Sequence, residues 1–183
     1  MAVVQLKARE ETRPATTIKP GKRKLTFKKE RFADIWTEIG PLFRLHYREI
    51  AQDKAAIPLA PDLVRYLTME GQGILHIVTA RHGTRLVGYV FYIVTFGLHY
   101  ARTIHAQTDL TYLHPNYRFG RGLSLRKSSG FRLLQAGERM LDDLKVEKRR
   151  GNVKLARDFG RLYEELGYRP EEIIYSKLVP KDG

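Results

Sequence analysis

Hydrophobic side chains begin to recur with a regular period near residue 31. They fall every three or four positions over 31–50, which predicts a helix with one buried face. The Gly40-Pro41 pair inside this range is expected to kink the helix or to restart it. A connector at 51–60 separates it from a second, shorter helix, which we predict over 61–69.

The middle of the chain has the patterns of strands. "GILHIVTAR" at 73–81 and "TRLVGYVFYIVTF" at 84–96 flank the tight turn His82-Gly83, so we predict an antiparallel hairpin. "ARTIHAQTDLTYL" at 101–113 is a predicted third strand.

The last third alternates between helix and strand patterns. We predict a long helix over 121–144, a weak strand over 149–154, and a helix over 155–166 that stops at Gly167. A final strand is predicted at 171–179. Early hairpins followed by alternating helices and strands indicate a mixed sheet covered by helices, an α/β or α+β fold.

The N-terminal residues have no sustained apolar period. The first 30 residues carry nine Lys or Arg and three Glu, a net charge of +6. We interpret 1–29 as a flexible basic arm, with a candidate strand at 23–28, and 30–183 as a single domain.

Composition narrows the class of protein. Of the 183 residues, 43% are hydrophobic and 29% are charged, which is typical of a globular domain. We find neither an apolar run long enough to cross a membrane nor a signal segment, so we expect a cytoplasmic protein. Cysteine is absent, which excludes disulfides, thiolate zinc sites and a cysteine nucleophile, and we expect no metal.

The net charge of +13 indicates a negatively charged partner. Nucleic acid, an acidic protein and an anionic cofactor all satisfy it. The alternative is a basic protein that binds none of them specifically.

One face of the third strand is unexpectedly polar. Side chains alternate across a strand, so His105, Gln107, Asp109 and Thr111 are expected to share a face. Desolvation there would raise the pKa of Asp109 and make it a candidate general base, with His105 as a second base or an orienting group. The alternative is a sheet face open to solvent, with His105 in a structural role.

The segment "RFGRGLS" follows this strand and leads into the predicted helix. Glycines let backbone N–H groups face a ligand, and the start of a helix adds unpaired N–H groups with a positive dipole end. Arg118 and Arg121 add charge and paired donors. Together these features suit a diphosphate.

These motifs resemble the GNAT superfamily of acetyl-CoA-dependent N-acetyltransferases, and most of all its phage-encoded members. Leu113-His114-Pro115-Asn116-Tyr117-Arg118 is similar to the "V-x-P-x-Y-R" step that follows a strand in this family. If Phe119 is an inserted residue, Gly122 falls on the second glycine of the family's phosphate turn, and Ser124 replaces the final Gly or Ala.

"LYEELGY" at 162–168 resembles the family's "LYexxGF" segment, although Ala156 stands where the family usually has Asn. The resemblance implies that Tyr163 protonates the departing CoA thiolate, whereas helical spacing alone would also fit a core residue. It further implies that the weak strand at 149–154 splays away from the third strand and that the pantetheine arm of CoA lies between them.

The resemblance therefore implies acetyl transfer to an amine, with Asp109 as base, Tyr163 as acid and oxyanion-stabilising N–H groups near Leu113. The residues it implies for the acetyl-CoA site are Tyr112, Leu113, Arg118, Phe119, Gly120, Arg121, Gly122, Leu123 and Ser124. The acceptor is unspecified: a small molecule, a protein or a nucleic acid. If the chain is phage-encoded, it would act in the host cytoplasm. The alternatives are a protein that binds nucleic acid or modifies DNA bases, and a non-catalytic inhibitor of a partner protein with the same fold.

Overall fold

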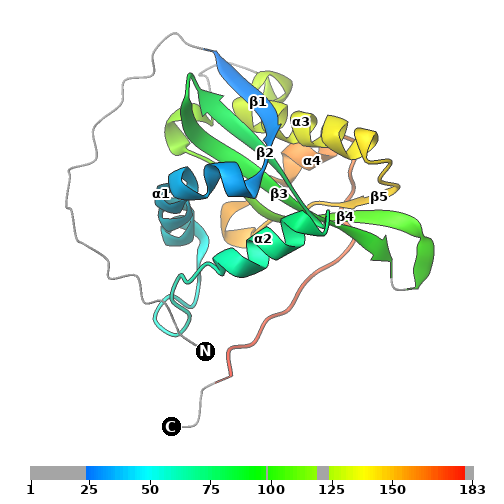
Figure 1. Cartoon of the computed structure of the whole chain (residues 1–183), viewed down its shortest axis with the longest axis horizontal. Helices are drawn as coiled ribbons and strands as arrows, with labels where there is room; N and C mark the ends of the chain where they lie inside the picture. The colour runs from blue at the N-terminus through cyan, green and yellow to red at the C-terminus, as the bar shows by residue number, and fades with distance from the viewer. Residues whose placement is uncertain (1–23, 98, 119–123, 180–183) are drawn as a thin grey trace, which may run out of the picture.

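A mixed sheet forms the centre of the computed structural model, which describes residues 24–97, 99–118 and 124–179. Within them, five strands lie side by side in chain order, β1-β2-β3-β4-β5. The first four are antiparallel, and β5 runs parallel to β4 (Figure 1). The strands are β1 Leu25–Glu30, β2 Leu75–His82, β3 Arg85–Gly97, β4 Tyr100–Leu113 and β5 Lys148–Arg150.

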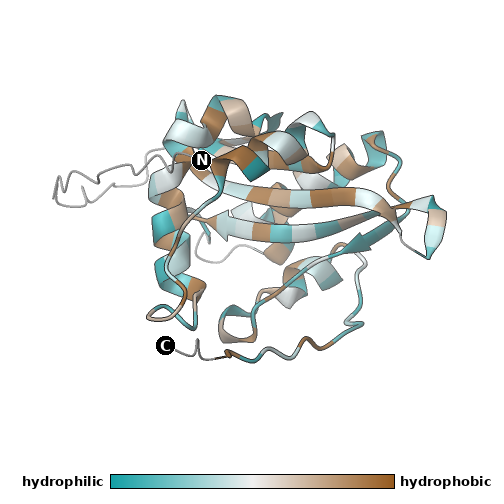
Figure 2. Cartoon of the chain, turned by 60° about the horizontal axis from the view of Figure 1, so that its bottom comes forward, coloured by the Kyte–Doolittle hydropathy of each residue, from teal (hydrophilic) through white to brown (hydrophobic). Residues whose placement is uncertain are grey.

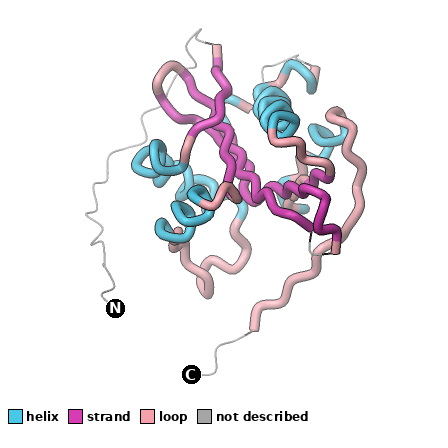
Figure 3. Tube along the Cα trace, turned by 45° about the vertical axis from the view of Figure 1, so that its right-hand side comes forward, coloured by secondary structure: helices cyan, strands magenta, loops and turns pink. Residues whose placement is uncertain are grey.

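Helices cover both faces of this sheet (Figure 3). On one face, α1 (Phe32–Ile50) packs its apolar stripe against a cluster that includes Ile77, Tyr89 and Phe91, with α2 (Leu63–Gly71) beside it. On the other face, α3 (Ser129–Asp143) and α4 (Gly160–Glu164) pack on a second cluster. Apolar residues occur on the central strands and on the helices, interspersed with polar ones (Figure 2).

The α+β class and most of the predicted elements are confirmed. The helix predicted over 31–50 is α1, which runs through Pro41 without restarting. The hairpin is β2 and β3, and the third strand is β4. Of the weak strand predicted at 149–154, only the start is a strand, the three-residue β5, and 151–154 have no regular secondary structure.

The domain begins earlier than predicted. The candidate strand at 23–28 is β1, which pairs with β2 from Leu25↔His82 to Glu30↔Ile77. Residues 25–29, which we assigned to the arm, therefore belong to the sheet. The rest of the predicted arm, 1–23, lies outside the described residues.

Two predicted helices are shorter than expected. The helix predicted over 121–144 begins at Ser129, because the Ser128 hydroxyl caps it by accepting from the Phe131 N–H at 3.1 Å. A separate 3₁₀ turn, Leu125–Lys127, precedes it. The helix predicted over 155–166 divides into a 3₁₀ turn, Leu155–Arg157, and α4.

The strand predicted at 171–179 is wrong: these residues form no regular secondary structure. At the start of the segment the side chains of Glu171 and Glu172, rather than backbone groups, pair with Lys148 and Arg150 of β5. The segment then leads away from the sheet (Figure 1), and Ile173, Ile174 and Tyr175 are exposed.

None of the helices in the described part of the chain has the length and apolar character needed to cross a membrane.

Candidate active site at the open edge of β4

A β-bulge interrupts β4 at Asp109. Phe91 of β3 pairs with Leu110 and Tyr92 pairs with Thr108, so Asp109 has no partner on β3. The extra residue reverses the alternation of side chains beyond it. The predicted common face of His105, Gln107, Asp109 and Thr111 is therefore wrong, because Thr111 lies beyond the bulge and lines the cavity against α3 and α4.

β4 and β5 separate at the same place. Their parallel pairing covers only His105↔Lys148 to Gln107↔Arg150. Asn152 makes the last link, with its N–H donating to Thr108 Oγ1 at 2.7 Å and its side-chain amide donating to the Thr108 carbonyl at 2.8 Å. Beyond Thr108, no described strand covers this edge of β4.

Peptide groups point out of the open edge. The His114 N–H donates to the Val87 carbonyl of β3 at 2.8 Å, and peptide groups alternate between the two edges of a strand. Those of Leu113 and Thr111 therefore point away from β3. An extended ligand could pair with this edge as a further strand would.

A cavity of about 270 Å³ adjoins this edge. It lies between the end of β4, the first turns of α3, the segment that contains α4, and the C-terminal end of α1. Its lining includes Thr111, Tyr112 and Leu113, with the N-cap Ser128 and Gly130 at the start of α3, Phe159 and Leu162 from around α4, and His46 and Glu49 from α1.

Tyr163 lies beside this cavity, in the core. Its side chain is buried and does not line the cavity, although its neighbour Leu162 does. Its hydroxyl donates to Thr108 Oγ1 over 3.4 Å, and burial raises its pKa, which keeps the phenol protonated. The ring packs on the backbone of Gly151, where a Cβ would lie 2.5 Å from it.

Asp109 lies on the opposite face of β4, towards α2. It remains solvent accessible, while partial desolvation raises its pKa and the nearby Arg65 opposes the rise. Asp109 and Tyr163 therefore do not share a face. The Asp109 side chain extends from the bulge on one face of β4. The Tyr163 hydroxyl contacts Thr108, the residue before the bulge, on the other face.

His105 lies farther back along β4. It is placed where β4 still pairs with both β3 and β5, its ring is 6.1 Å from that of Tyr100, and it does not line the cavity. Four residues of strand separate it from Asp109, about 13 Å at 3.3 Å per residue. The structure does not bring these two candidate bases together.

Arg118 is engaged within the protein. Its guanidinium donates to both carboxylate oxygens of Glu49, at 2.5 and 2.6 Å, and to the Leu113 carbonyl at 2.6 Å. It also lies over the Tyr112 ring, 5.4 Å from the centroid. Arg118 thus joins α1 to the end of β4, and its charge is already paired.

Most of the predicted phosphate turn, Phe119, Gly120, Arg121, Gly122 and Leu123, lies outside the described residues. Ser124, at its end, is exposed and precedes the 3₁₀ turn. Tyr112 and Leu113, predicted to contact the cofactor, do line the cavity.

Sequence reasoning missed His46 and Glu49, although a signal was present. His46 continues the apolar stripe of α1, three residues after Phe43, where another hydrophobic residue is expected. A buried histidine on such a stripe requires a hydrogen-bond partner or a ligand.

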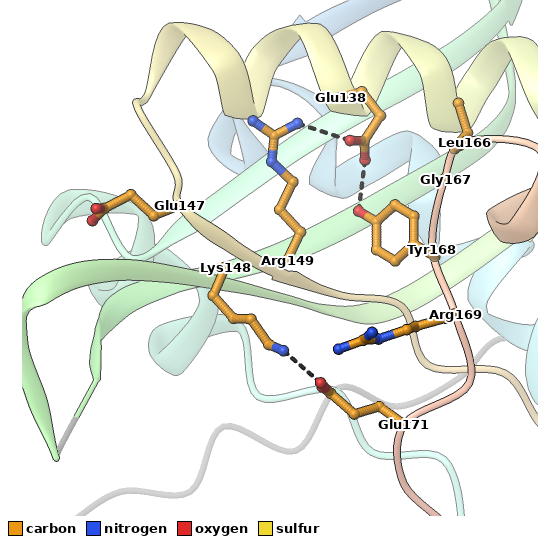
Figure 4. A pocket seen from close by; sticks show the side chains of 9 residues that line it. All are labelled: Glu138, Glu147, Lys148, Arg149, Leu166, Gly167, Tyr168, Arg169 and Glu171. Carbon is orange, nitrogen blue, oxygen red and sulfur yellow. Dashed lines mark hydrogen bonds and ion pairs between the residues drawn. The ribbon is translucent and has the colours of Figure 1, made fainter.

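A second cavity, of about 300 Å³, lies at the N-terminal end of β5 (Figure 4). Four of its charged groups form two ion pairs within the cavity. Glu138 accepts from Arg149 at 2.8 Å and from the Tyr168 hydroxyl at 2.7 Å, and Lys148 pairs with Glu171 at 2.7 Å. This network joins α3 to β5 and to the segment after α4, so it supports the wall that holds Tyr163.

Comparison with solved structures identifies the fold. Similar structures include a ribosomal-protein-alanine N-acetyltransferase from Brucella melitensis biovar Abortus 2308 (TM-score 0.60, 18% identity, covering 84% of this chain and 99% of that chain). An aminoglycoside acetyltransferase, HMB0005, from an uncultured soil metagenomic sample has a TM-score of 0.64 at 10% identity, covering 86% and 99%. A predicted acetyltransferase with acetyl-CoA from Clostridium acetobutylicum has a TM-score of 0.59 at 12% identity, covering 85% and 96%.

No family model and no curated protein sequence matches the chain. At these identities the likeness establishes the fold alone, which is the GNAT fold that the sequence resemblance implied.

Proposed function

We propose that the protein is an acetyl-CoA-dependent N-acetyltransferase. The observation that carries the proposal is the parting of β4 and β5 at the bulge, which leaves an open strand edge over a cavity that reaches the first turn of α3. A fold shared with acetyltransferases, one of them described with acetyl-CoA, supports it.

The groups around the cavity fit the chemistry of CoA. The pantetheine arm is an extended chain with amides, and the open edge offers peptide N–H and C=O groups to pair with them. The Thr111 hydroxyl is buried and lines the cavity, and it has no hydrogen-bond partner among the described residues. An amide-bearing ligand would satisfy it.

The start of α3 suits the anionic end of the molecule. A helix of this length presents unpaired N–H groups and a positive dipole end, and Gly130 in its first turn lines the cavity. The predicted turn at 119–124 would add to this site. Arg118, paired with Glu49, would position the end of β4 rather than bind phosphate.

In this proposal acetyl-CoA supplies an activated acetyl thioester. Asp109, directly or through a water, takes the proton of an amine that enters from the α2 side. Peptide N–H groups of the open edge near Leu113 stabilise the developing negative charge on oxygen. The Tyr163 hydroxyl, protonated at neutral pH, gives its proton to the departing sulfur after a small movement towards the cavity.

The absence of cysteine makes the reaction straightforward to follow. A thiol reagent added to the reaction detects only released CoA, because the protein contributes no thiol. We expect thiol release that depends on an amine, tested with polyamines, aminoglycosides, peptides with free N-termini, and nucleic acids. The product should be heavier by about 42 Da, the exchange of one proton for an acetyl group. If no amine from any of these classes stimulates thiol release, the proposed activity is wrong.

The charge of +13 favours an acceptor that is, or lies on, a nucleic acid over a polycationic one. Binding to DNA or RNA that weakens steeply with salt would support this second candidate, and no binding at low salt would reject it.

A further inference from the structure

His46 is a buried histidine at the wall of the β4 cavity. It is the last buried residue on the stripe of α1, only 6% exposed, and its ring lies 4.9 Å from that of Tyr112. It lines the cavity together with Thr111 and Leu113. The roles of Asp109 and Tyr163 proposed above do not involve it.

One ring nitrogen of His46 is taken by a tyrosine. Nδ1 lies 2.9 Å from the hydroxyl of Tyr89, a fully buried side chain of β3. Burial raises the pKa of Tyr89, so its hydroxyl keeps its proton. His46 is the only hydrogen-bond partner of this hydroxyl within the described residues. A buried O–H without an acceptor is costly, so the hydroxyl donates to Nδ1.

This bond fixes the tautomer of the imidazole. Burial lowers the pKa of His46 to about 4, with Arg118 adding to the effect and Glu49 opposing it, so the ring is neutral at pH 7. A neutral imidazole whose Nδ1 accepts a hydrogen bond carries its proton on Nε2. Nε2 has no partner among the described residues.

We propose that the Nε2–H of His46 is the side-chain donor that this cavity offers to a carbonyl oxygen of its ligand. Resting on the proposed function, the inference assigns that oxygen to an amide carbonyl of the pantetheine arm of acetyl-CoA. Because the lone pair of Nδ1 is occupied by Tyr89, His46 cannot take up the amine proton. It is a binding residue and not a second base.

The Thr111 hydroxyl complements this donor. It lines the same cavity and also lacks a partner among the described residues, and it can accept from an amide N–H or donate to a carbonyl. A neutral donor and a hydroxyl match an uncharged amide chain better than a phosphate, which favours charged donors.

Calorimetry with two probes tests the proposal. CoA presents both the amide arm and an adenosine diphosphate, whereas ADP lacks the amide arm. His46→Phe keeps an aromatic ring but removes the donor. We expect this variant to bind CoA about tenfold more weakly than the wild type and to bind ADP with unchanged affinity. His46→Gln, whose amide can donate, should restore part of the affinity. Equal CoA affinity in the wild type and in a folded His46→Phe would overturn the inference and leave the proposed function intact.

A spectroscopic measurement separates a contact from a structural role. Long-range ¹H–¹⁵N spectra of the wild type should show a protonated Nε2 and an unprotonated Nδ1, with Nε2 shifting when CoA is added. Protonation at Nδ1, or an Nε2 signal that CoA does not move, would contradict the assignment. If the wild type binds no CoA, the proposed function fails and this ligand assignment fails with it.

Discussion

The hydroxyl of Tyr163 lies 3.4 Å from Oγ1 of Thr108, the last residue of β4 before the bulge. This contact brings α4 to the point where β4 and β5 part, and the next residue, Asp109, faces the other side of the sheet. An acid and a base placed in this way would approach one reaction centre from opposite faces of β4.

Removing the Tyr163 hydroxyl should affect activity far more than stability. The contact is long, and the ring would keep its packing on Gly151, so Tyr163→Phe should cost about 1 kcal/mol or less of unfolding free energy. Loss of a general acid should lower kcat by about 10²–10⁴-fold. Thiol-release kinetics and a denaturant titration measure the two effects. An unchanged kcat would remove Tyr163 from the reaction.

Asp109→Asn should lower activity without lowering stability. Burial raises the pKa of Asp109 above its usual 3.8, so the folded state disfavours the charged form, and the neutral amide should leave stability unchanged or slightly higher at pH 7. As a lost base it should lower kcat by about 10²–10⁴-fold.

His105→Asn is the matched control, on the same strand but away from the cavity. We expect it to retain kcat within about threefold, since it would lose no contact to the reacting groups. Equal losses in the two variants would contradict the placement of the base at the bulge.

The Arg118–Glu49 pair should make stability depend on pH. Arg118 lowers the pKa of Glu49 below its usual 4.5. Such a carboxylate stabilises the fold above its unfolded pKa, and this contribution is lost as pH falls through the lower folded pKa. Urea titrations of the wild type should therefore show a steeper decline below about pH 4.5 than those of Glu49→Gln, in which other paired carboxylates such as Glu30 still contribute.

At pH 7 the Glu49→Gln substitution should cost about 1–3 kcal/mol, because it leaves the guanidinium with weaker partners. Arg118→Lys keeps the positive charge but loses the two parallel hydrogen bonds to the carboxylate. This variant should therefore be less stable than the wild type. If both variants are as stable as the wild type, this pair does not hold α1 to the end of β4.

The sequence was sufficient to predict the helices and strands that bury one regular face. The stripe of α1 and the alternation in β2 and β3 follow directly from burial, and both elements appear near their predicted bounds. The bulge was not predictable, because the apolar and polar positions of 101–113 continue to alternate through Asp109 while the backbone does not.

Contacts between residues far apart in the sequence account for the other features that the sequence did not predict. The pairing of Arg118 with Glu49, 69 residues away in the sequence, could not be predicted, whereas its proximity to the phosphate turn could. The segment 171–179 has the composition of a strand, but side-chain ion pairs hold its start beside β5 and its apolar residues stay exposed. The local sequence pattern indicates whether a segment favours a strand. It does not indicate whether an edge of the sheet is free for that segment to pair with.

The central claim, a CoA site at the start of α3, is tested most directly by calorimetric titration of acetyl-CoA into three proteins. Gly130 lies in the first helical turn and lines the cavity. Gly130→Glu and Gly130→Gln place side chains of nearly equal size there, and the Cβ of either would lie 3.0 Å from Cδ1 of Leu162, so the two variants carry the same steric cost. Because only the charge differs, we predict that the wild type binds acetyl-CoA and that Gly130→Glu binds at least tenfold more weakly than Gly130→Gln. Equal affinities in the two variants, or no binding by the wild type, would contradict the account.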